Sequence, residues 1–265
     1  MDPLLSVRSK LTLKICNILE HHPSLVEPSF NVNSLRLSII VPVYNEAKTI
    51  QCILDRLATV SKASGYEIII VDDGSTDGTT DLIRTHLPNG ARFIQNDSNQ
   101  GKSAAVRNGL ALAAGDWVLV QDADLEYDPS EIPKLLTCAT NATVAVYGRR
   151  PSHWERPARW VFASGVLLVD LAIFIVYGKW LRDHASCYKL VRRQTLCNFN
   201  LQSNGFEGCI EITAKLMRSG IKIVQVPISY APRPISAGKK LSPLYGFAAL
   251  AAVWKYRNWS QSTAC

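Results

Sequence analysis

Two hydrophobic patterns alternate along the first half of the chain. Continuous apolar runs rich in β-branched residues occur in the segments 37–43, 67–71, 91–95 and 117–124. Such runs suit strands that are buried on both faces of a sheet. Helical spacing of apolar residues follows Glu46 and is also expected over 79–87 and 103–114. This alternation predicts an α/β fold with a Rossmann-like, mainly parallel sheet flanked by helices, which binds ligands at the carboxyl ends of its strands.

The second half is less regular and contains two long apolar segments. We expect strands over 143–150 and 221–230 and helices over 160–180 and 205–219. The 160–180 segment approaches the roughly 20 residues of a membrane-spanning helix, but Asp170 at its centre is costly inside a bilayer. We therefore predict a helix that lies in the membrane interface or packs on the domain. The 244–254 segment is too short to span and has the flanking Lys, Arg and Trp residues of an interfacial belt.

Most of the chain is expected to form one domain. Residues 1–36 predict a short helix and a polar linker, residues 37–257 the domain, and residues 258–265 a C-terminal tail. The N-terminal segment lacks the continuous apolar core and the cleavage site of a signal peptide. The seven cysteines are odd in number and include no Cys-x-x-Cys pair, so they indicate free thiols rather than a disulfide scaffold or a zinc site.

Charge is distributed unevenly between the two halves. The whole chain carries 29 Lys and Arg against 22 Asp and Glu, a net charge of +7. Residues 1–148 hold 17 acidic and 12 basic side chains, whereas residues 149–265 hold 17 basic and 5 acidic ones. This asymmetry indicates a metal or sugar-nucleotide site beside a surface that meets anions. Nucleic acid is the least favoured anion, because the sequence has no Lys/Arg-rich run and no nucleic-acid-binding motif.

The strongest chemical signal is the segment Asp122-Ala123-Asp124, which directly follows an apolar strand. Two carboxylates separated by one small residue at a strand end can converge on one divalent cation. Such oxygen ligands suit Mg²⁺ or Mn²⁺, which complete their coordination with substrate phosphate and water. Glu126 is close enough in the chain to be a third ligand, directly or through water. Two ordinary surface aspartates are the plain alternative, and the position after a strand favours the metal site.

A second polar segment ends the first predicted strand. Pro42 stops the strand, Tyr44 offers a face for stacking, and Glu46 can accept a hydrogen bond from a nucleobase. The alternative is a plain strand-to-helix turn with a capping residue.

Two more polar segments also allow both a ligand-binding and a structural interpretation. Asp72 and Asp73 suit the N–H groups of a base or the hydroxyls of a ribose, or else they cap the next helix. Lys102, at a helix start in the Gly-containing segment 99–103, suits a phosphate, although the spacing is not that of a P-loop.

Taken together, these motifs resemble the family 2 glycosyltransferases, which have the GT-A fold. The resemblance covers about residues 37–257 and rests on VPVYNE (41–46), VDDGSTDGT (71–79), NQGKSAAVRNGL (99–110), GDWVLVQDADLEYDP (115–129), YGRR (147–150), DHASCYK (183–189), GFEGCIEITAKL (205–216) and VPISYAPRPISAGKKL (226–241). The segments are similar to the branch that includes dolichol-phosphate mannose synthases and bacterial polyprenyl-phosphate sugar transferases. One departure is Cys187, which stands where those synthases often have Gly.

The resemblance implies a role for each candidate residue. The implied nucleotide-binding residues are Pro42, Tyr44, Glu46, Asp72, Asp73, Lys102, Asp122, Ala123, Arg233 and Lys240. The implied ligands of Mg²⁺ or Mn²⁺ are Asp122, Asp124 and Glu126. The candidate catalytic residues are Asp122, Asp124, Arg150, Asp183 and Glu211.

The implied reaction transfers a sugar from a nucleotide-sugar donor with inversion at the anomeric carbon. The expected acceptor is a polyprenyl phosphate at the cytoplasmic face of a membrane, to which the enzyme binds peripherally. Such a phosphate is already an anion and needs no strong general base. A sugar hydroxyl, soluble or on a glycan, needs one, and Asp183, Glu207 and Glu211 are the candidates. His184 has no evident partner in the sequence and suits a structural role.

Two other classes of protein are weighed against this interpretation. A nucleotidyltransferase usually carries a Gly-rich segment after its first strand, which VPVYNE (41–46) lacks. A non-catalytic sugar-nucleotide binder is expected to lose the Asp122-Ala123-Asp124 motif, which this chain keeps. Both observations favour a glycosyltransferase.

Overall fold

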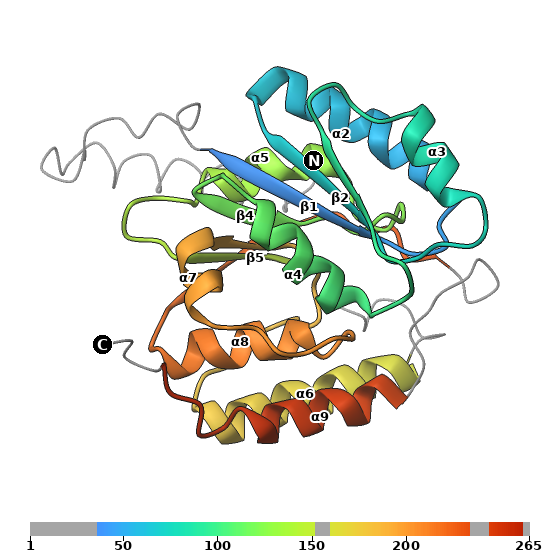
Figure 1. Cartoon of the computed structure of the whole chain (residues 1–265). Helices are drawn as coiled ribbons and strands as arrows, with labels where there is room; N and C mark the ends of the chain where they lie inside the picture. Colours follow the sequence, from blue (N-terminus) through green and yellow to red (C-terminus); the bar gives the residue numbers. More distant parts are fainter. Residues whose placement is uncertain (1–35, 152–159, 234–243, 262–265) are drawn as a thin grey trace, which may run out of the picture. The chain divides into compact units, whose positions relative to one another are not determined.

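A computed structural model describes residues 36–151, 160–233 and 244–261 (Figure 1). The helix and linker expected over residues 1–36 lie outside the described residues, apart from Arg36. Lys240 and the end of the expected tail also lie outside them. The proposed domain limits therefore stay a prediction, and the candidate site is described without Lys240.

The described residues form one seven-stranded sheet in the order β3-β2-β1-β4-β6-β5-β7. Its strands are β1 (Leu37–Val43), β2 (Glu67–Asp72), β3 (Arg92–Gln95), β4 (Trp117–Val120), β5 (Ala145–Arg149), β6 (Lys189–Arg192) and β7 (Ile223–Pro227). In this sheet β6 runs antiparallel to both neighbours, β4 and β5, whereas the other paired strands are parallel. The predicted mainly parallel α/β sheet is confirmed, and β6 is a strand that the hydrophobic pattern did not reveal.

Helices connect these strands and cover the sheet (Figure 1). The helices of the described residues are α2 (Ile50–Ser64), α3 (Thr79–Thr85), α4 (Lys102–Leu112), the 3-10 turn η3 (Pro129–Glu131), α5 (Ile132–Leu136), α6 (Trp160–Tyr177), α7 (Arg193–Asn198), α8 (Gly208–Arg218) and α9 (Leu244–Lys255). Helix α4 packs on β1 and β2, while α6, α8 and α9 contact one another. No helix in the described parts of the chain has the length and apolarity needed to cross a membrane.

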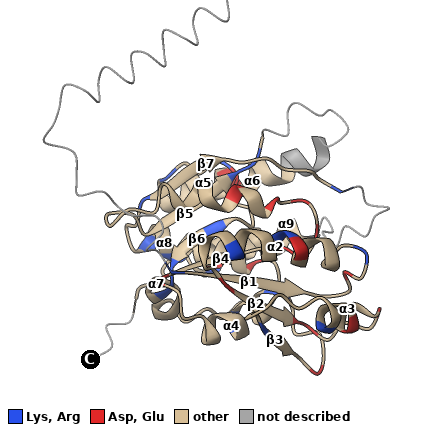
Figure 2. Cartoon of the chain, turned by 90° about the horizontal axis from the view of Figure 1, so that it is seen from above, with Lys and Arg blue, Asp and Glu red and all other residues tan. Residues whose placement is uncertain are grey.

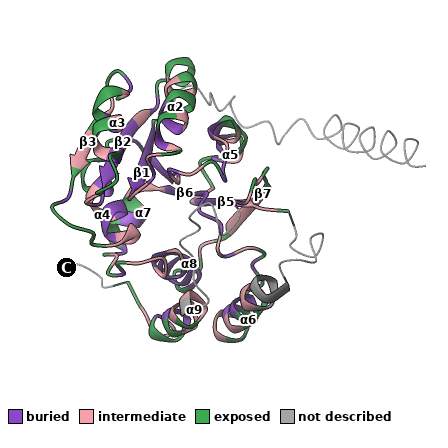
Figure 3. Ribbon diagram, turned by 90° about the vertical axis from the view of Figure 1, so that its right-hand side faces the viewer, coloured by how far each residue is buried: buried purple, intermediate pink, exposed green. Residues whose placement is uncertain are grey.

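The layer of α6, α8 and α9 has a buried side and an exposed side (Figure 3). Val169 and Ile173 of α6 and Val253 of α9 belong to a core cluster that also contains Ile210 of α8. Apolar residues on the other side of α6 and α9 remain exposed, among them Ile175 and Phe247. These two helices therefore contribute to the core while they present apolar side chains outward.

Helix α4 approaches the sheet closely at Gly109. A Cβ atom on Gly109 would lie 2.5 Å from Cγ2 of Ile40, a fully buried residue of β1. The side chain of Ile40 is β-branched and packed, so it has little room to move. The missing side chain at Gly109 thus sets the distance between α4 and the sheet. Helix α4 begins at Lys102.

We expect Gly109→Ala to destabilise the protein by about 1–3 kcal/mol, because the added methyl group overpacks this contact. Gly165→Ala is the matched control, since a Cβ on Gly165 of α6 meets nothing within 4 Å. Ala also has a higher helix propensity than Gly, so the control should be neutral or stabilising. Urea denaturation of both variants measures the difference, and equal unfolding midpoints would contradict tight packing at Gly109.

Candidate active site

The carboxyl ends of β1, β2 and β4 bring three of the predicted polar segments to one edge of the sheet. Pro42 and Val43 of β1 pair with Val71 and Asp72 of β2. The backbone N–H of Gln121, just after β4, donates to the carbonyl of Ile40 in β1 at 2.9 Å. The segments 42–46, 72–75 and 121–126 therefore start side by side, as a parallel sheet requires.

The antiparallel strand β6 adds a fourth segment to this edge. Leu190 of β6 pairs with Leu119 of β4 in opposite directions, so the start of β6 lies beside the end of β4. The residues just before β6 therefore meet the residues just after β4. Accordingly, Sγ of Cys187 lies 3.0 Å from Oδ1 of Asp122.

Lys102 forms an ion pair with Asp122. Its ammonium is also 3.5 Å from Sγ of Cys187 and 5.2 Å from the ring centre of Phe206. Burial alone disfavours the charged ammonium, but the nearby Asp122 carboxylate outweighs burial and raises the pKa of Lys102. The structure therefore places a firmly charged Lys at the Asp-x-Asp motif, and its binding of phosphate stays a prediction.

Arg233 contacts Asp124, the second carboxylate of the Asp-x-Asp motif. Its guanidinium donates to both oxygens of Glu46, at 2.9 and 3.0 Å, and is 3.3 Å from Oδ2 of Asp124. Burial raises the pKa of Asp124 to about 7, and repulsion from Asp122 and Glu126 adds to this effect. The carboxylates are thus crowded, and Arg233 supplies part of the positive charge that they need. Figure 2 marks the acidic and basic residues along the chain.

Glu126, the predicted third ligand, contacts the segment after β7 in this structure. Its carboxylate accepts a hydrogen bond from the Tyr230 hydroxyl and another, at 2.9 Å, from the backbone N–H of Arg233. In the described residues, no group of three His, Cys, Asp or Glu side chains is arranged to hold a metal ion. Glu126 instead fastens the segment after β7 to the site.

Asp72 and Asp73 shape the loops around the site. Asp73 is 2% exposed and accepts from the N–H groups of Gln100 and Gly101, at 3.0 and 2.7 Å, and from the Asn96 amide. Asp72 accepts from the N–H of Ser75 at 3.0 Å and from the Thr80 hydroxyl. Asp72 thus forms the turn after β2, and Asp73 holds the loop before α4, whereas neither side chain caps the next helix, α3.

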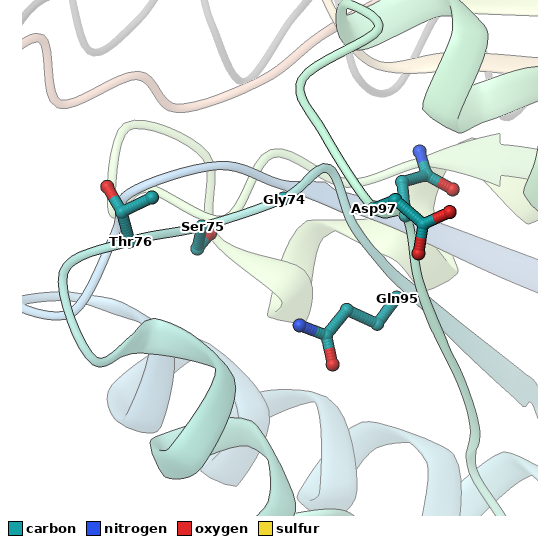
Figure 4. A pocket seen from close by; sticks show the side chains of 6 residues that line it. Gly74, Ser75, Thr76, Gln95 and Asp97 are labelled. Carbon is teal, nitrogen blue, oxygen red and sulfur yellow. The ribbon is translucent and has the colours of Figure 1, made fainter.

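A polar hollow of about 410 Å³ lies next to these turns. It is lined by residues 74–76 after β2 and by residues 95–97 at the end of β3 (Figure 4). Nearby, Pro42 is buried, Tyr44 is half-buried, and the carbonyl of Ala123 accepts from the Thr49 hydroxyl at 2.9 Å. These residues stand at the same edge, as the sequence motifs predicted.

Arg150 and Asp183 form a buried pair beside the motif. The guanidinium donates to both carboxylate oxygens, at 2.9 and 2.5 Å for the shortest contacts, and the Arg150 backbone N–H adds a bond of 2.9 Å. Burial opposes ionisation of Asp183, but Arg150 outweighs burial and lowers the pKa of Asp183. The Arg150 guanidinium also lies 4.9 Å from the ring centre of Tyr230. A carboxylate held this way is a poor general base.

Glu211, a predicted catalytic residue, lies in the interior of the protein. Its carboxylate is fully buried in α8, where it pairs with Lys215 at 2.6 Å and accepts from the N–H groups of Gln202 and Ser203. Lys215 in turn donates to the carbonyl of Phe199 at 2.8 Å. Glu211 therefore supports the 199–205 loop and is committed to that role.

The 199–205 loop also occupies the start of α4. The carbonyl of Asn204 accepts from the N–H groups of Ser103 and Ala104, at 2.7 and 3.2 Å. Arg107 fixes the same loop through its bond to the side chain of Asn204 at 2.6 Å. The amides of Ser103 and Ala104 are therefore used within the protein, and the side chain of Lys102 is the group of α4 that lies at the Asp-x-Asp motif.

Two residues of the site were not singled out as candidates from the sequence. Tyr230 binds Glu126 through its hydroxyl and lies under Arg150. Cys187 contacts Asp122 and was noted only as a departure from relatives. In the sequence, only their location in the motif segments 226–241 and 183–189 pointed to the site. Residue type alone gives neither Tyr230 nor Cys187 a chemical role.

A mainly parallel α/β sheet with an Asp-x-Asp pair and cations at the end of its middle strand defines the class of GT-A glycosyltransferases. Solved structures of glucosyl-3-phosphoglycerate synthase from Mycobacterium tuberculosis share this fold. The complex with Mn²⁺, UDP-glucose and phosphoglyceric acid has a TM-score of 0.65 at 19% identity and covers 89% of this chain and 87% of that one. Another, with Mg²⁺ and UDP, has a TM-score of 0.65 at 20% identity, over 89% and 86% of the two chains.

The chain belongs to glycosyl transferase family 2, whose model matches residues 38–198. It is 28% identical over 233 residues to a dolichol-phosphate mannosyltransferase of Pyrococcus furiosus, covering 85% of this chain and 64% of that protein. It is 30% identical over 212 residues to glycosyltransferase AglJ of Haloferax volcanii, over 78% and 66% of the two chains.

A third relative is the undecaprenyl-phosphate 4-deoxy-4-formamido-L-arabinose transferase of Aeromonas hydrophila. The identity is 30% over 171 residues, which cover 63% of this chain and 52% of that protein. The chain thus spans about half to two thirds of the length of these curated relatives. The family and the glycosyltransferase class predicted from the motifs are confirmed.

We expect Glu211→Leu to lower the free energy of unfolding by roughly 3–5 kcal/mol, because it leaves the ammonium of Lys215 buried without its partner. Lys134→Met is the control, since it breaks a half-exposed pair with Glu131 that is worth about 0–1 kcal/mol. Chemical denaturation measures both variants. A fall for Glu211→Leu no larger than for Lys134→Met would contradict the supporting role of the buried pair.

Proposed function

We propose that this chain transfers a sugar from a nucleotide-sugar to the phosphate of a polyprenyl lipid, with inversion at the anomeric carbon. The observation that carries the proposal is that two of the three candidate bases are buried and paired with a cation. Asp183 binds Arg150, and Glu211 is buried against Lys215. Glu207, the third candidate, accepts from the N–H of Gly205 at 3.0 Å. An anionic phosphate acceptor needs no base, so this arrangement favours it over a hydroxyl acceptor.

Asp122 and Asp124 are the residues that we propose as ligands of Mg²⁺ or Mn²⁺. Their carboxylate oxygens are the donors that these cations prefer, and their crowding beside Glu126 leaves an excess of negative charge for a cation to neutralise. When bound, the metal supplies Lewis-acid stabilisation of the departing diphosphate. Lys102 pairs with Asp122, and Arg233 pairs with Asp124. Both cations are therefore placed to stabilise the departing diphosphate as well.

The nucleoside is proposed to lie along the ends of β1 and β2. Tyr44 and Glu46 leave the first strand there, and Pro42 holds the strand end. Asp72 and Asp73 contribute by fixing the turns around the nucleoside, through the backbone bonds described above. Arg150, which follows β5 and is held by Asp183, is proposed to bind the acceptor phosphate.

The exposed face of α6 and α9 is the proposed contact with the membrane. The apolar side chains of this face and their exposures are Leu168 58%, Ile175 72%, Phe247 74% and Trp254 62%, together with Leu167, Leu171, Phe174 and Trp180. Arg257 lies 4.1 Å from the ring centre of Trp254, and Lys255 ends α9. Apolar side chains beside cations suit the interface of an anionic bilayer, so peripheral association is proposed.

A transfer assay tests the proposed function. The protein is incubated with undecaprenyl or dolichyl phosphate, Mg²⁺ or Mn²⁺, and separately with labelled GDP-mannose, UDP-glucose and UDP-N-acetylglucosamine. Label in the organic-extractable lipid with one donor, with inverted anomeric configuration, is the expected result. Donor turnover without lipid label, combined with transfer to a glycan hydroxyl, would overturn the lipid acceptor.

We expect Asp124→Asn to lower kcat for transfer by on the order of 100-fold or more, because it removes a charged group that acts in the transition state. Mn²⁺ binding, followed by electron paramagnetic resonance, should weaken in the same variant. Asp128→Asn is the matched control, since Asp128 caps η3 by accepting from Ser130 at 3.0 Å. Full transfer activity in Asp124→Asn would refute the metal assignment.

We expect the double change Ile175→Glu and Phe247→Glu to weaken binding to phosphatidylglycerol vesicles by about 100-fold. Each buried apolar side chain contributes roughly 1.5–3 kcal/mol, and 1.4 kcal/mol corresponds to a factor of ten. Leu87→Glu, at a site that is 38% exposed and outside this face, is the control. Vesicle sedimentation measures binding, and unchanged binding of the double variant would exclude this face as the membrane contact.

A further inference from the structure

Asp170 is the single charged residue of helix α6, and it is buried. It lies in the sequence WVFASGVLLVDLAIFIVY and is 8% exposed. A buried carboxylate among apolar residues is unfavourable unless it has a partner. The partner is His184, which is 3% exposed and whose Nδ1 lies 2.5 Å from Oδ1 of Asp170. Asp170, which argued against a membrane-spanning helix, therefore connects α6 to the loop that contains His184.

The loop that Asp170 reaches, residues 183–189, contacts the reacting groups at two points. Its first residue, Asp183, holds the guanidinium of Arg150. Further along, Cys187 contacts Asp122 of the Asp-x-Asp motif at 3.0 Å. His184 lies between these two contacts, so its position bears on both.

Hydrogen bonds within the 183–189 loop and to Tyr127 brace this loop. The buried ammonium of Lys189 donates to the carbonyls of His184 and Ser186, each at 2.7 Å. The N–H of Cys187 donates to the Tyr127 hydroxyl at 3.1 Å. Asp183 has a φ of 61°, a left-handed conformation that non-Gly residues seldom adopt without tertiary contacts to hold it.

The outer side of α6 is the face proposed above for the membrane. Leu167, Leu168, Leu171 and Ile175 are exposed there, whereas Asp170 points into the protein. A helix transmits a displacement of one side to the other, because its backbone is rigid over a few turns. A ligand on the outer face and the reacting groups thus contact one continuous path of packed and hydrogen-bonded residues, of the kind that carries coupling between sites.

We propose that the Asp170–His184 pair couples the apolar face of α6 to the 183–189 loop, so that membrane contact fixes Arg150 and Asp122 for transfer. Asp170 and His184 are positioning residues in this scheme. The inference rests on the proposed function, because it assumes that lipid occupies the face. It predicts that vesicles protect the loop from amide hydrogen exchange only while the pair is intact.

The test compares four proteins by hydrogen exchange of residues 183–189 with and without phosphatidylglycerol vesicles. The variant Asp170→Leu/His184→Leu removes the tie and leaves no unpaired buried polar group, which favours folding. Asp170→Asn keeps a hydrogen-bonding partner for His184. Tyr177→Phe is the matched control, since it removes another bond of α6, from the Tyr177 hydroxyl to the carbonyl of Val253 at 2.8 Å.

We expect vesicles to slow exchange of the loop by about 5- to 150-fold, the usual range of coupling between two sites, in the wild type, in Tyr177→Phe and in Asp170→Asn. The double Leu variant should bind vesicles equally but show no protection. Its kcat for lipid transfer should fall by at least about fivefold, with an unchanged KM for the donor.

Two results would overturn the coupling. One is loop exchange in the wild type that vesicles do not change while lipid transfer proceeds; this leaves the proposed function standing. The other is a double Leu variant that matches the wild type in protection and in kcat. Failure of the wild type to bind vesicles and to label lipid is a different outcome, which removes the proposed function and the coupling with it.

Discussion

Crowded carboxylates at the carboxyl ends of β1 and β4 are the constraint on which the rest of this structure depends. Glu46, Asp122 and Asp124 come together there because parallel strands end at the same edge. Like charges in a partly buried site repel, and the raised pKa of Asp124 reflects this repulsion as well as burial. The site therefore needs cations, which Lys102 and Arg233 provide from α4 and from the segment after β7.

This requirement gives a physical meaning to the uneven charge of the sequence. The acidic first half supplies the carboxylates at the strand ends, and the basic second half supplies Arg150 and Arg233. The antiparallel β6 makes the meeting of the halves possible, because it returns the 183–189 loop to the end of β4. The same loop carries Asp183 and Cys187 to the site. A fully parallel sheet would start β6 at the opposite edge and leave these groups far from the Asp-x-Asp motif.

Several carboxylates near the site serve the scaffold. Asp73 binds three N–H groups of the loop before α4, Asp183 holds Arg150, and Glu211 holds the loop that covers the start of α4. From the sequence each of them was a candidate for chemistry, because residue type shows only that it can accept hydrogen bonds. Whether such a carboxylate already accepts hydrogen bonds within the protein depends on backbone groups that other segments supply. Glu211 and Lys215 stand at i and i+4, a spacing at which an ion pair forms along one face of a helix.

The sequence by itself determined the alternation of strands and helices, the parallel character of the first four strands, the Asp-x-Asp motif after β4 and the family. These features depend on neighbouring residues, whose spacing sets which side chains share a face or a strand end. The tertiary structure decided the antiparallel β6, the Arg233–Glu46 pair between residues 187 positions apart, and the Asp170–His184 tie. Such contacts depend on how distant segments pack, because hydrogen-bond partners far apart in the chain leave no periodic pattern for the sequence to display.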